Sequence, residues 1–262
     1  MNLTRHPISV PTRAPDGRTN AYILGSDPAL LIDPADRTPE LDRLVETRGV
    51  EHILVTHTHP DHVGGVAAYA SAAGATTWAR RGYEQRFERA TGIEPDRVLE
   101  GRHRLYGFDG RLECLAMPGH APDHVAIHDR STGAVVVGDC AVASGSVVVG
   151  TPDGDMRAYL TSLRRLLAMK PNTLYPAHGL VIDEPRAVLE RLLAHRLERE
   201  RKVAAAVESG AGDTEMILER AYETDLEGVR DLAEATVEAH LEKLAVEGRI
   251  KWEPADDHVR PV

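Results

Sequence analysis

The sequence predicts a mixed α/β fold followed by a helical C-terminal part, and three observations support this. A short apolar run at residues 52–56 is followed by a polar loop and an alanine-rich stretch at 63–73, which indicates a strand–loop–helix unit. Between Leu99 and Asp139 the pattern changes to short strands separated by turns. From Pro185 onward, leucines recur at helical spacing. Strands that alternate with helices are typical of an α/β domain.

The elements of the first part follow one another closely. Apolar runs that end at turn residues predict strands, and leucine, valine or alanine at helical spacing predicts helices. The predicted strands are 20–24, 29–34, 52–56, 76–79, 135–139 and 173–178. The predicted helices are 39–47, 63–73, 83–90 and 156–169.

The chain changes character at about residue 183. The spacing predicts a long helix over 185–207, a second helix that starts with Asp213 or Thr214 as its N-cap, and a third over 229–246. Residues 248–252 then turn into a short strand. We therefore expect a large α/β domain at 1–182 and a small winged-helix-like domain at 183–262.

Composition excludes several classes of protein. Apolar residues make up 42% and charged residues 27% of the 262 residues, as in an ordinary globular protein. No apolar run reaches the roughly 18 residues of a membrane helix, and the N-terminus lacks the apolar stretch of a secretory signal. Cys114 and Cys140 fit reduced thiols rather than a disulfide framework. We expect a cytoplasmic protein with no membrane partner.

The charge is unevenly distributed along the chain. The net charge is −10, and residues 183–262 carry 20 acidic and 12 basic side chains, a net of −8. Phosphate backbones are repelled by such a surface, so the tail is not expected to bind nucleic acid. Arginine outnumbers lysine by 27 to 4, which fits either a salt-adapted cell or a GC-rich genome.

Four residues that commonly bind metals stand within six positions: His57, His59, Asp61 and His62. On an extended segment His57 and His59 project the same way, because the side-chain period of a strand is two. As the chain turns into the next helix, Asp61 and His62 point toward the same space. Imidazole and carboxylate groups hold zinc at about 2.0–2.2 Å. A lone histidine is more often a core or surface residue, but this spacing predicts a zinc site, with manganese or iron as alternatives.

Three further candidate ligands stand at the ends of predicted strands. They are His120 after Met-Pro-Gly, Asp139 after a valine run, and His178 before a glycine. Polar residues beside turns at strand ends form the functional edge of a sheet. Gly64 and Gly65, directly after the four-residue motif, allow the following helix to approach its neighbours closely.

Taken in order, these motifs resemble the metallo-β-lactamase superfamily over residues 18–180. The matching segments are Asp33-Pro34, the loop 57–62, residues 118–120, Gly138-Asp139 and residues 176–179. The resemblance implies a four-layer αββα sandwich with two metals along one edge of its paired sheets. It also implies a first metal held by His57, His59 and His120. A second metal would be held by Asp61, His62 and His178, with Asp139 bridging the two.

A narrower resemblance extends to about residue 252. The segments 138–146, 152–163, 195–200 and 237–250 look like a lactamase-β-like family, which includes a mitochondrial single-strand endoribonuclease and has a winged-helix-like tail. Such a tail more often packs or shapes a substrate pocket than binds nucleic acid. Glutathione-thioester hydrolases and persulfide dioxygenases share the metal loop and stay open as relatives.

The implied ligand set predicts a hydrolase. Two divalent cations about 3.5–4 Å apart share a water molecule and lower its pKa toward 7, so that a metal-bridged hydroxide attacks carbonyl carbon or phosphorus. Asp61 is the expected catalytic residue, as a ligand and as a proton acceptor. Cys140 follows Asp139 on a strand and is expected to be buried rather than nucleophilic.

The substrate is expected to be a small ester, a thioester of the acyl-glutathione or acyl-CoA type, or a lactone. A channel for single-stranded RNA should combine basic and aromatic side chains, but aromatics are only 4% of this chain. An endoribonuclease is therefore the first alternative, and a non-catalytic metal-binding scaffold the second. A homodimer stays open as an assembly.

Overall fold

The computed structural model describes residues 2–105, 108, 112–223 and 226–262. Within these residues the chain separates into two compact units. The first unit contains residues 1–117, 123–145 and 169–188, and the second contains 118–122, 146–168 and 189–262. Both β-sheets that supply candidate ligands belong to the first unit.

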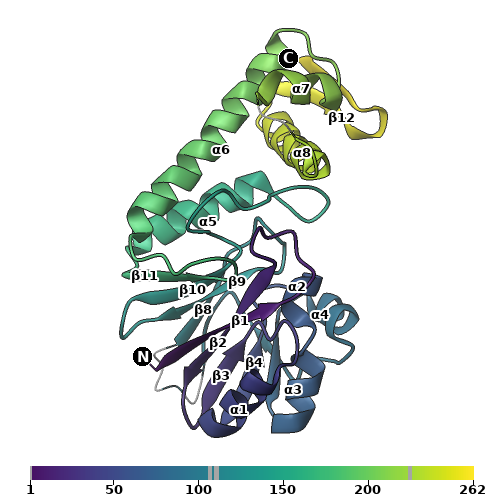
Figure 1. Cartoon of the computed structure of the whole chain (residues 1–262). Helices are drawn as coiled ribbons and strands as arrows, with labels where there is room; N and C mark the ends of the chain where they lie inside the picture. The colour runs from purple at the N-terminus through teal and green to yellow at the C-terminus, as the bar shows by residue number, and fades with distance from the viewer. Residues whose placement is uncertain (1, 106–107, 109–111, 224–225) are drawn as a thin grey trace. The chain divides into compact units, whose positions relative to one another are not determined.

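The first sheet of this unit has its strands in sequence order (Figure 1). They are β1 (Leu3–Ser9), β2 (Arg18–Gly25), β3 (Ala29–Ile32), β4 (Val50–Leu54), β5 (Thr76–Arg80) and β6 (Arg97–Leu99). The pairs β1–β2 and β2–β3 are antiparallel, and the pairs from β3 to β6 are parallel. The carboxyl ends of β3, β4 and β5 therefore meet at one edge.

The second sheet has the order β11-β10-β9-β8-β7. Its strands are β7 (Arg102–Arg104), β8 (Leu112–Ala116), β9 (Val125–Asp129), β10 (Ala134–Gly138) and β11 (Thr173–Pro176). Strands β10 and β11 are parallel, and the other pairs are antiparallel. The predicted short strands between Leu99 and Asp139 are thus confirmed, except that residues 106–107 and 109–111 lie outside the described residues.

Two apolar cores hold the first unit together. One lies between the sheets, where Ile32 and Leu54 of the first sheet meet Ile127 and Val136 of the second. The other lies on the opposite face of the first sheet, which is covered by helices (Figure 1). These helices are α1 (Pro39–Arg48), α3 (Val66–Ala73) and α4 (Glu84–Thr91). The unit is therefore layered as helices, sheet and sheet, with an aliphatic interior, as the low aromatic content requires.

The predicted helix over residues 63–73 is wrong in its bounds. The chain is helical over α2 (Pro60–Val63), breaks at two glycines, and resumes in α3. The backbone amide of Gly65 donates a hydrogen bond of 2.8 Å to Pro34 O, and a Cβ on Gly65 would lie 2.8 Å from the same oxygen. A Cβ on Gly64 would collide with Ala35 O. Both glycines thus allow the predicted close approach of the helix start, here to Pro34 and Ala35 just after β3.

The second unit is mainly helical. It contains most of α5 (Met156–Met169) and α6 (Pro185–Glu208), together with α7 (Thr214–Ala221), α8 (Arg230–Val246), β12 (Ile250–Glu253) and β13 (His258–Pro261). A 3-10 turn, η1 (Pro254–Asp256), joins the two strands of the hairpin. The Asp213 side chain accepts a hydrogen bond from Met216 N, which confirms it as the N-cap of α7. Among the described residues no helix has the length and apolarity that a membrane crossing needs.

A buried charge cluster joins α6, α8 and the start of the hairpin in this unit. Glu200 pairs with Lys243 at 2.7 Å and with Arg249 at 3.1 Å. His240 is fully buried beside the cluster, 4.0 Å from Glu200. Burial lowers the pKa of His240 to about 3, assisted by the positive charges of Arg196 and Lys243 and, less strongly, of Arg199 and His195. The carboxylate of Glu200 does not offset this lowering of the His240 pKa, because Lys243 and Arg249 already neutralise its charge.

We expect the buried imidazole of His240 to make the protein acid-sensitive. The pKa of His240 is below its ordinary value of 6.5 in the folded state, so the unfolded chain binds more protons below that pH. The contribution of the neutral His240 imidazole to the free energy of unfolding is complete above pH 6.5 and is lost as the pH falls toward 3. Between pH 7 and pH 5, wild type should lose about 2 kcal/mol more unfolding free energy than His240→Leu in urea titrations. His258→Leu, which removes an exposed imidazole of the same unit, should lose as much as wild type; equal losses in all three proteins would contradict this expectation.

Candidate metal centre

The candidate ligands of the first unit come from the carboxyl ends of strands in both sheets. His57 follows β4 of the first sheet, while Asp139 follows β10 and His178 follows β11 of the second. Strands β10 and β11 are parallel, and the amide of Ala177 donates a hydrogen bond of 3.1 Å to Gly138 O. This pairing brings the loops that carry Asp139 and His178 together.

The loop after β4 brings its own four candidates close together. Nε2 of His57 and Nδ1 of His59 lie 2.9 Å apart, and the ring centroids of His57 and His62 lie 4.1 Å apart. His59 is the N-cap of α2 and Pro60 is its first residue. The turn into this short helix therefore places Asp61 and His62 close to His57 and His59. These contacts place the imidazoles of His57, His59 and His62 side by side, and their shared role as ligands stays a prediction.

Two groups of ligand atoms converge in this unit. The first group is His57, His62 and Asp139, and the second is Asp61, His62 and His178; within each group the ligand atoms lie within 4.8 Å of one another. Nε2 of His62 lies 3.8 Å from a carboxylate oxygen of both Asp61 and Asp139. Nε2 of His178 lies 3.3 Å from Asp139 and 3.7 Å from Asp61.

The chemistry of these groups fits a divalent metal. His62 is completely buried, and its Nε2 has no hydrogen-bond partner, although its Nδ1–H donates to Asp33 Oδ2 at 3.1 Å. An imidazole fixed by its Nδ1 leaves the Nε2 lone pair for a metal, which is the usual arrangement of a ligating histidine. Imidazole nitrogens and carboxylates together form the donor set that zinc and related metals prefer.

Negative charge dominates the surroundings of His62 and His178. Burial by itself lowers the pKa of His62, but the carboxylates of Asp33, Asp139 and Asp61 outweigh it, and the pKa is raised. Burial likewise lowers the pKa of His178, but its hydrogen bond with Asp139 and the charges of Asp139 and Asp61 raise the pKa to about 9. A field that favours protonated imidazole also favours a bound cation.

Strand β2 fixes the loop that carries His178. The Asn20 amide nitrogen donates hydrogen bonds of 3.0 Å to both Pro176 O and Gly179 O, and the Tyr22 hydroxyl donates one of 2.6 Å to Pro176 O. Nδ1–H of His178 donates to Arg18 O at 2.7 Å, which leaves its Nε2 directed toward the carboxylates. The sequence predicts Asn20 and Tyr22 only as strand residues, because their partners lie more than 150 positions away.

We expect Asn20→Asp to weaken metal binding. The change keeps the side-chain size but replaces two N–H donors by an anion that faces two carbonyl oxygens, so the loop bearing His178 should shift. Loss of such outer hydrogen bonds typically costs 10–100-fold in metal affinity. Zinc uptake by metal-stripped protein, measured against a chromogenic chelator, would show this loss, and Tyr22→Phe should show a smaller one. Wild-type zinc affinity in a folded Asn20→Asp protein would contradict this role.

Two more buried side chains support the ligand loops. Asp33 directly follows β3 and accepts hydrogen bonds from Thr56 N at 2.6 Å and Thr56 Oγ1 at 2.7 Å, besides the one from His62. His124 accepts a hydrogen bond of 3.1 Å from the backbone amide of Asp139, and its ring lies 5.2 Å from that of His57. The strand-end position of Asp33 was a signal in the sequence, and the close spacing of His124 after His120 was a weaker one.

His120 belongs to the second unit of the chain. Its Nδ1–H donates a hydrogen bond of 2.7 Å to Val148 O of the same unit, which leaves Nε2 as the donor atom for a metal. Gly119 directly before it has a φ of +138°, and a Cβ there would collide with the backbone of Tyr159. The fixed backbone and ring suit a metal ligand. That His120 binds a metal together with His57 and His59 stays a prediction.

Cys140 is not available as a nucleophile. It is 1% exposed, and burial raises the pKa of its thiol to about 12. Cys114 is also free and buried. The predicted burial of Cys140 is confirmed, and both cysteines are outside disulfides, as predicted.

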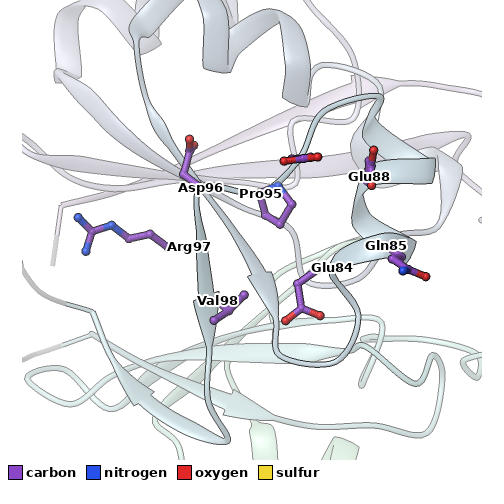
Figure 2. A pocket seen from close by; sticks show the side chains of 8 residues that line it. Glu84, Gln85, Glu88, Pro95, Asp96, Arg97 and Val98 are labelled. Carbon is purple, nitrogen blue, oxygen red and sulfur yellow. The ribbon is translucent and has the colours of Figure 1, made fainter.

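A surface hollow beside α4 is separate from these ligands (Figure 2). Figure 2 shows Glu84 and Glu88 projecting from α4, with Asp96 and Arg97 on the segment that forms β6. None of its lining residues is a candidate ligand, and carboxylates predominate among its charged groups. The hollow therefore adds nothing to the metal centre.

The fold and the converging imidazole and carboxylate groups define a mixed α/β protein with a metal centre at the edge of paired sheets. The sequence profile of the Metallo-beta-lactamase superfamily matches residues 14–178, more than half of the chain. The protein belongs to this superfamily, and it is a metal-dependent hydrolase, as its members are. The predicted mixed α/β class and the predicted enzyme class are confirmed.

Curated relatives cover most of the chain. A Beta-lactamase-like protein 2 homolog from Drosophila melanogaster is 28% identical over 91% of this chain and 86% of its own length. The homolog of the same name from Caenorhabditis elegans is 25% identical over 89% and 80%. An atrochrysone carboxyl ACP thioesterase from Emericella nidulans is 27% identical over 90% and 76%.

Solved structures agree with the fold. A metallo-beta-lactamase family protein from Thermus thermophilus matches with a TM-score of 0.78 and 24% identity, over 99% of this chain and 98% of that one. A second protein, TTHA1623, crystallised in a di-iron-bound form, is 32% identical, with a TM-score of 0.56 over 71% of this chain and 98% of that one.

Proposed function

We propose that the protein is a two-zinc hydrolase of small esters or thioesters. The observation that carries this proposal is the position of His62, whose buried Nε2 belongs to both ligand groups and has no hydrogen-bond partner. The two groups together offer five ligand side chains, more than the four that one tetrahedral zinc ion takes, so they suit a pair of cations better than a single one. The metal pair would supply Lewis acidity and lower the pKa of a water molecule.

The proposed ligand sets follow the superfamily motifs. His57, His59 and His120 would hold one cation, Asp61, His62 and His178 the other, and Asp139 would bridge them. Asp61 is the proposed catalytic residue, because its carboxylate is only partly buried and can exchange a proton with water or substrate. Asp33 and Arg18 O fix the Nδ1 atoms of His62 and His178, so their Nε2 lone pairs stay directed inward.

A thioester is the favoured substrate class. The Emericella nidulans relative is named a thioesterase, which supports acyl transfer to water rather than phosphodiester cleavage. The chain has few aromatic residues and a net charge of −10, which is unsuited to an extended nucleic-acid channel. The acyl carbonyl needs polarisation and an activated water molecule, and the proposed centre would supply both.

We further propose that residues 183–262 form a winged-helix-like domain. The order of its elements supports this assignment, since α6, α7 and α8 are followed by the β12–β13 hairpin. The domain has a separate apolar core that includes Val207, Ile217, Leu241 and Ile250. Under this assignment, the proposed metal centre is built from residues 1–182.

One experiment separates the substrate classes. Purified protein is loaded with zinc, its metal content is measured, and it is given either acyl-CoA and acyl-glutathione thioesters, lactones and simple esters, or a fluorescent single-stranded RNA. We expect close to two zinc ions per chain and metal-dependent thioester hydrolysis that Asp61→Ala abolishes. RNA cleavage alone would overturn the substrate class, a content near zero would overturn the metal pair, and two metals without any turnover would indicate a non-catalytic scaffold.

A further inference from the structure

The loop between β1 and β2 is closed on itself by backbone hydrogen bonds. The amide of Val10 donates to Gly17 O at 3.2 Å, and the amide of Gly17 donates to Ala14 O at 3.0 Å. Gly17 has a φ of +64°, a left-handed conformation that glycine adopts at no steric cost. Within this loop the Thr12 hydroxyl oxygen accepts a hydrogen bond of 3.2 Å from Ala14 N. Thr12 is thus built into the turn of the loop.

The same hydroxyl also reaches the metal centre. Thr12 Oγ1 donates a hydrogen bond of 2.5 Å to Asp61 Oδ2, across 49 positions of the sequence. The direction is fixed, because an ionised carboxylate only accepts. One bond accepted from Ala14 and one donated to Asp61 use the proton of the hydroxyl and one of its lone pairs. The carboxylate keeps Oδ1, which lies 3.8 Å from His62 Nε2.

Asp61 needs such support more than the buried ligands His62 and Asp139 do. His62 and Asp139 are held in the interior, whereas the Asp61 side chain is 18% exposed and comes from a short helix. A ligating carboxylate is commonly oriented by a hydrogen bond to its second oxygen. Thr12 supplies that bond from a different element of the same unit.

On the basis of the proposed function, we propose that Thr12 is a positioning residue of the metal centre. Its hydroxyl orients the Asp61 carboxylate and couples the loop at residues 10–17 to occupancy of the metal site. Metal binding should fix Asp61, and through Thr12 it should hold the loop closed. Removal of the hydroxyl should weaken metal binding. The loop should then open equally readily with and without bound metal.

Thr12→Val tests the proposal, because valine keeps the shape of threonine and lacks the hydroxyl. Zinc affinity is measured by chelator competition, and we expect it to fall 10–100-fold for one of the two ions. Thr12→Ser retains the hydroxyl and should bind within about threefold of wild type. Thr47→Val removes an exposed threonine hydroxyl from α1 and should change nothing.

A second measurement follows the loop itself. Trypsin cleaves after the exposed Arg13, so release of the fragment 1–13 reports opening of the loop. In wild type and Thr12→Ser, zinc should slow this cleavage at least about tenfold relative to metal-stripped protein, by the ordering of a bound loop. In Thr12→Val zinc should give little protection, while cleavage after Arg130, in the turn between β9 and β10, stays the same in all proteins.

The two proposals fail in different ways. Wild-type zinc affinity and full zinc protection in Thr12→Val would overturn the role of Thr12 and leave the hydrolase proposal intact. Absence of zinc binding in wild type would overturn the metal pair itself. Weakened zinc binding in Thr12→Val, together with no hydrolysis of any thioester by wild type, would support the positioning role and reject the substrate class.

Discussion

Asp61→Ala should lose one metal ion and lower turnover at least about a thousandfold, since a catalytic metal contributes several kcal/mol and about 1.4 kcal/mol is a factor of ten. Asp61 takes part in a group with His62 and His178 and comes from α2 beside the sheet edge. Its side chain is partly exposed, so removal of the carboxylate leaves no unpaired charge in the core. Metal content and kcat on the best thioester measure the effect.

The matched control is Asp42→Ala, which removes a surface carboxylate of α1 that pairs with Arg37 at 3.0 Å. Exposed ion pairs contribute little, so metal content, turnover and thermal unfolding should stay at wild-type values. Without metal, Asp61→Ala and wild type should unfold at nearly the same temperature. Two metals and unchanged turnover in Asp61→Ala would remove Asp61 from the proposed mechanism.

Asp33→Ala should lower the free energy of unfolding by about 3–5 kcal/mol. Asp33 is fully buried, and its removal leaves three donors of Thr56 and His62 without an acceptor, each costing about 1–3 kcal/mol. Its φ of +50° adds to the cost, because alanine tolerates the left-handed region less well than aspartate or asparagine. Urea unfolding of metal-stripped protein measures the change.

Asp33→Asn gives the internal comparison. Asparagine keeps the shape and the backbone preference, and its carbonyl oxygen can still accept from Thr56, but its NH₂ group would stand where the second carboxylate oxygen accepts a hydrogen bond. We expect a loss smaller than that of Asp33→Ala, together with weaker zinc binding because His62 is less firmly oriented. A loss under about 1 kcal/mol in Asp33→Ala would show that Thr56 and His62 find other partners.

Much of the site could be predicted because its ligands are local in sequence or stand at strand ends. The loop 57–62 contains four candidates within six positions, and Asp139 and His178 each come just after a strand. Such patterns depend on side-chain periodicity and on the parallel arrangement of neighbouring strands, both of which a sequence displays. The structure brings these side chains together within the first unit.

The supporting residues could not be predicted, because their roles arise from contacts between distant segments. Thr12 lies 49 positions from Asp61, and Asn20 lies 156 positions from Pro176. Strand β1 was also missed, since Pro7 and mixed polar residues weaken its strand pattern. Proline is tolerated there because β1 is at the sheet edge, which only the pairing order reveals.

The division of ligands between the two sheets has a consequence for biosynthesis. His57 and His62 are translated early, but Asp139 and His178 follow more than 75 residues later, on strands that must first pair as β10 and β11. No nascent fragment that ends before His178 can present both ligand groups. Under the proposed ligand set, the metal pair is acquired after synthesis of the first unit is nearly complete. A chain that stalls on the ribosome before that point would contain the histidines of the loop 57–62 but not the complete proposed centre.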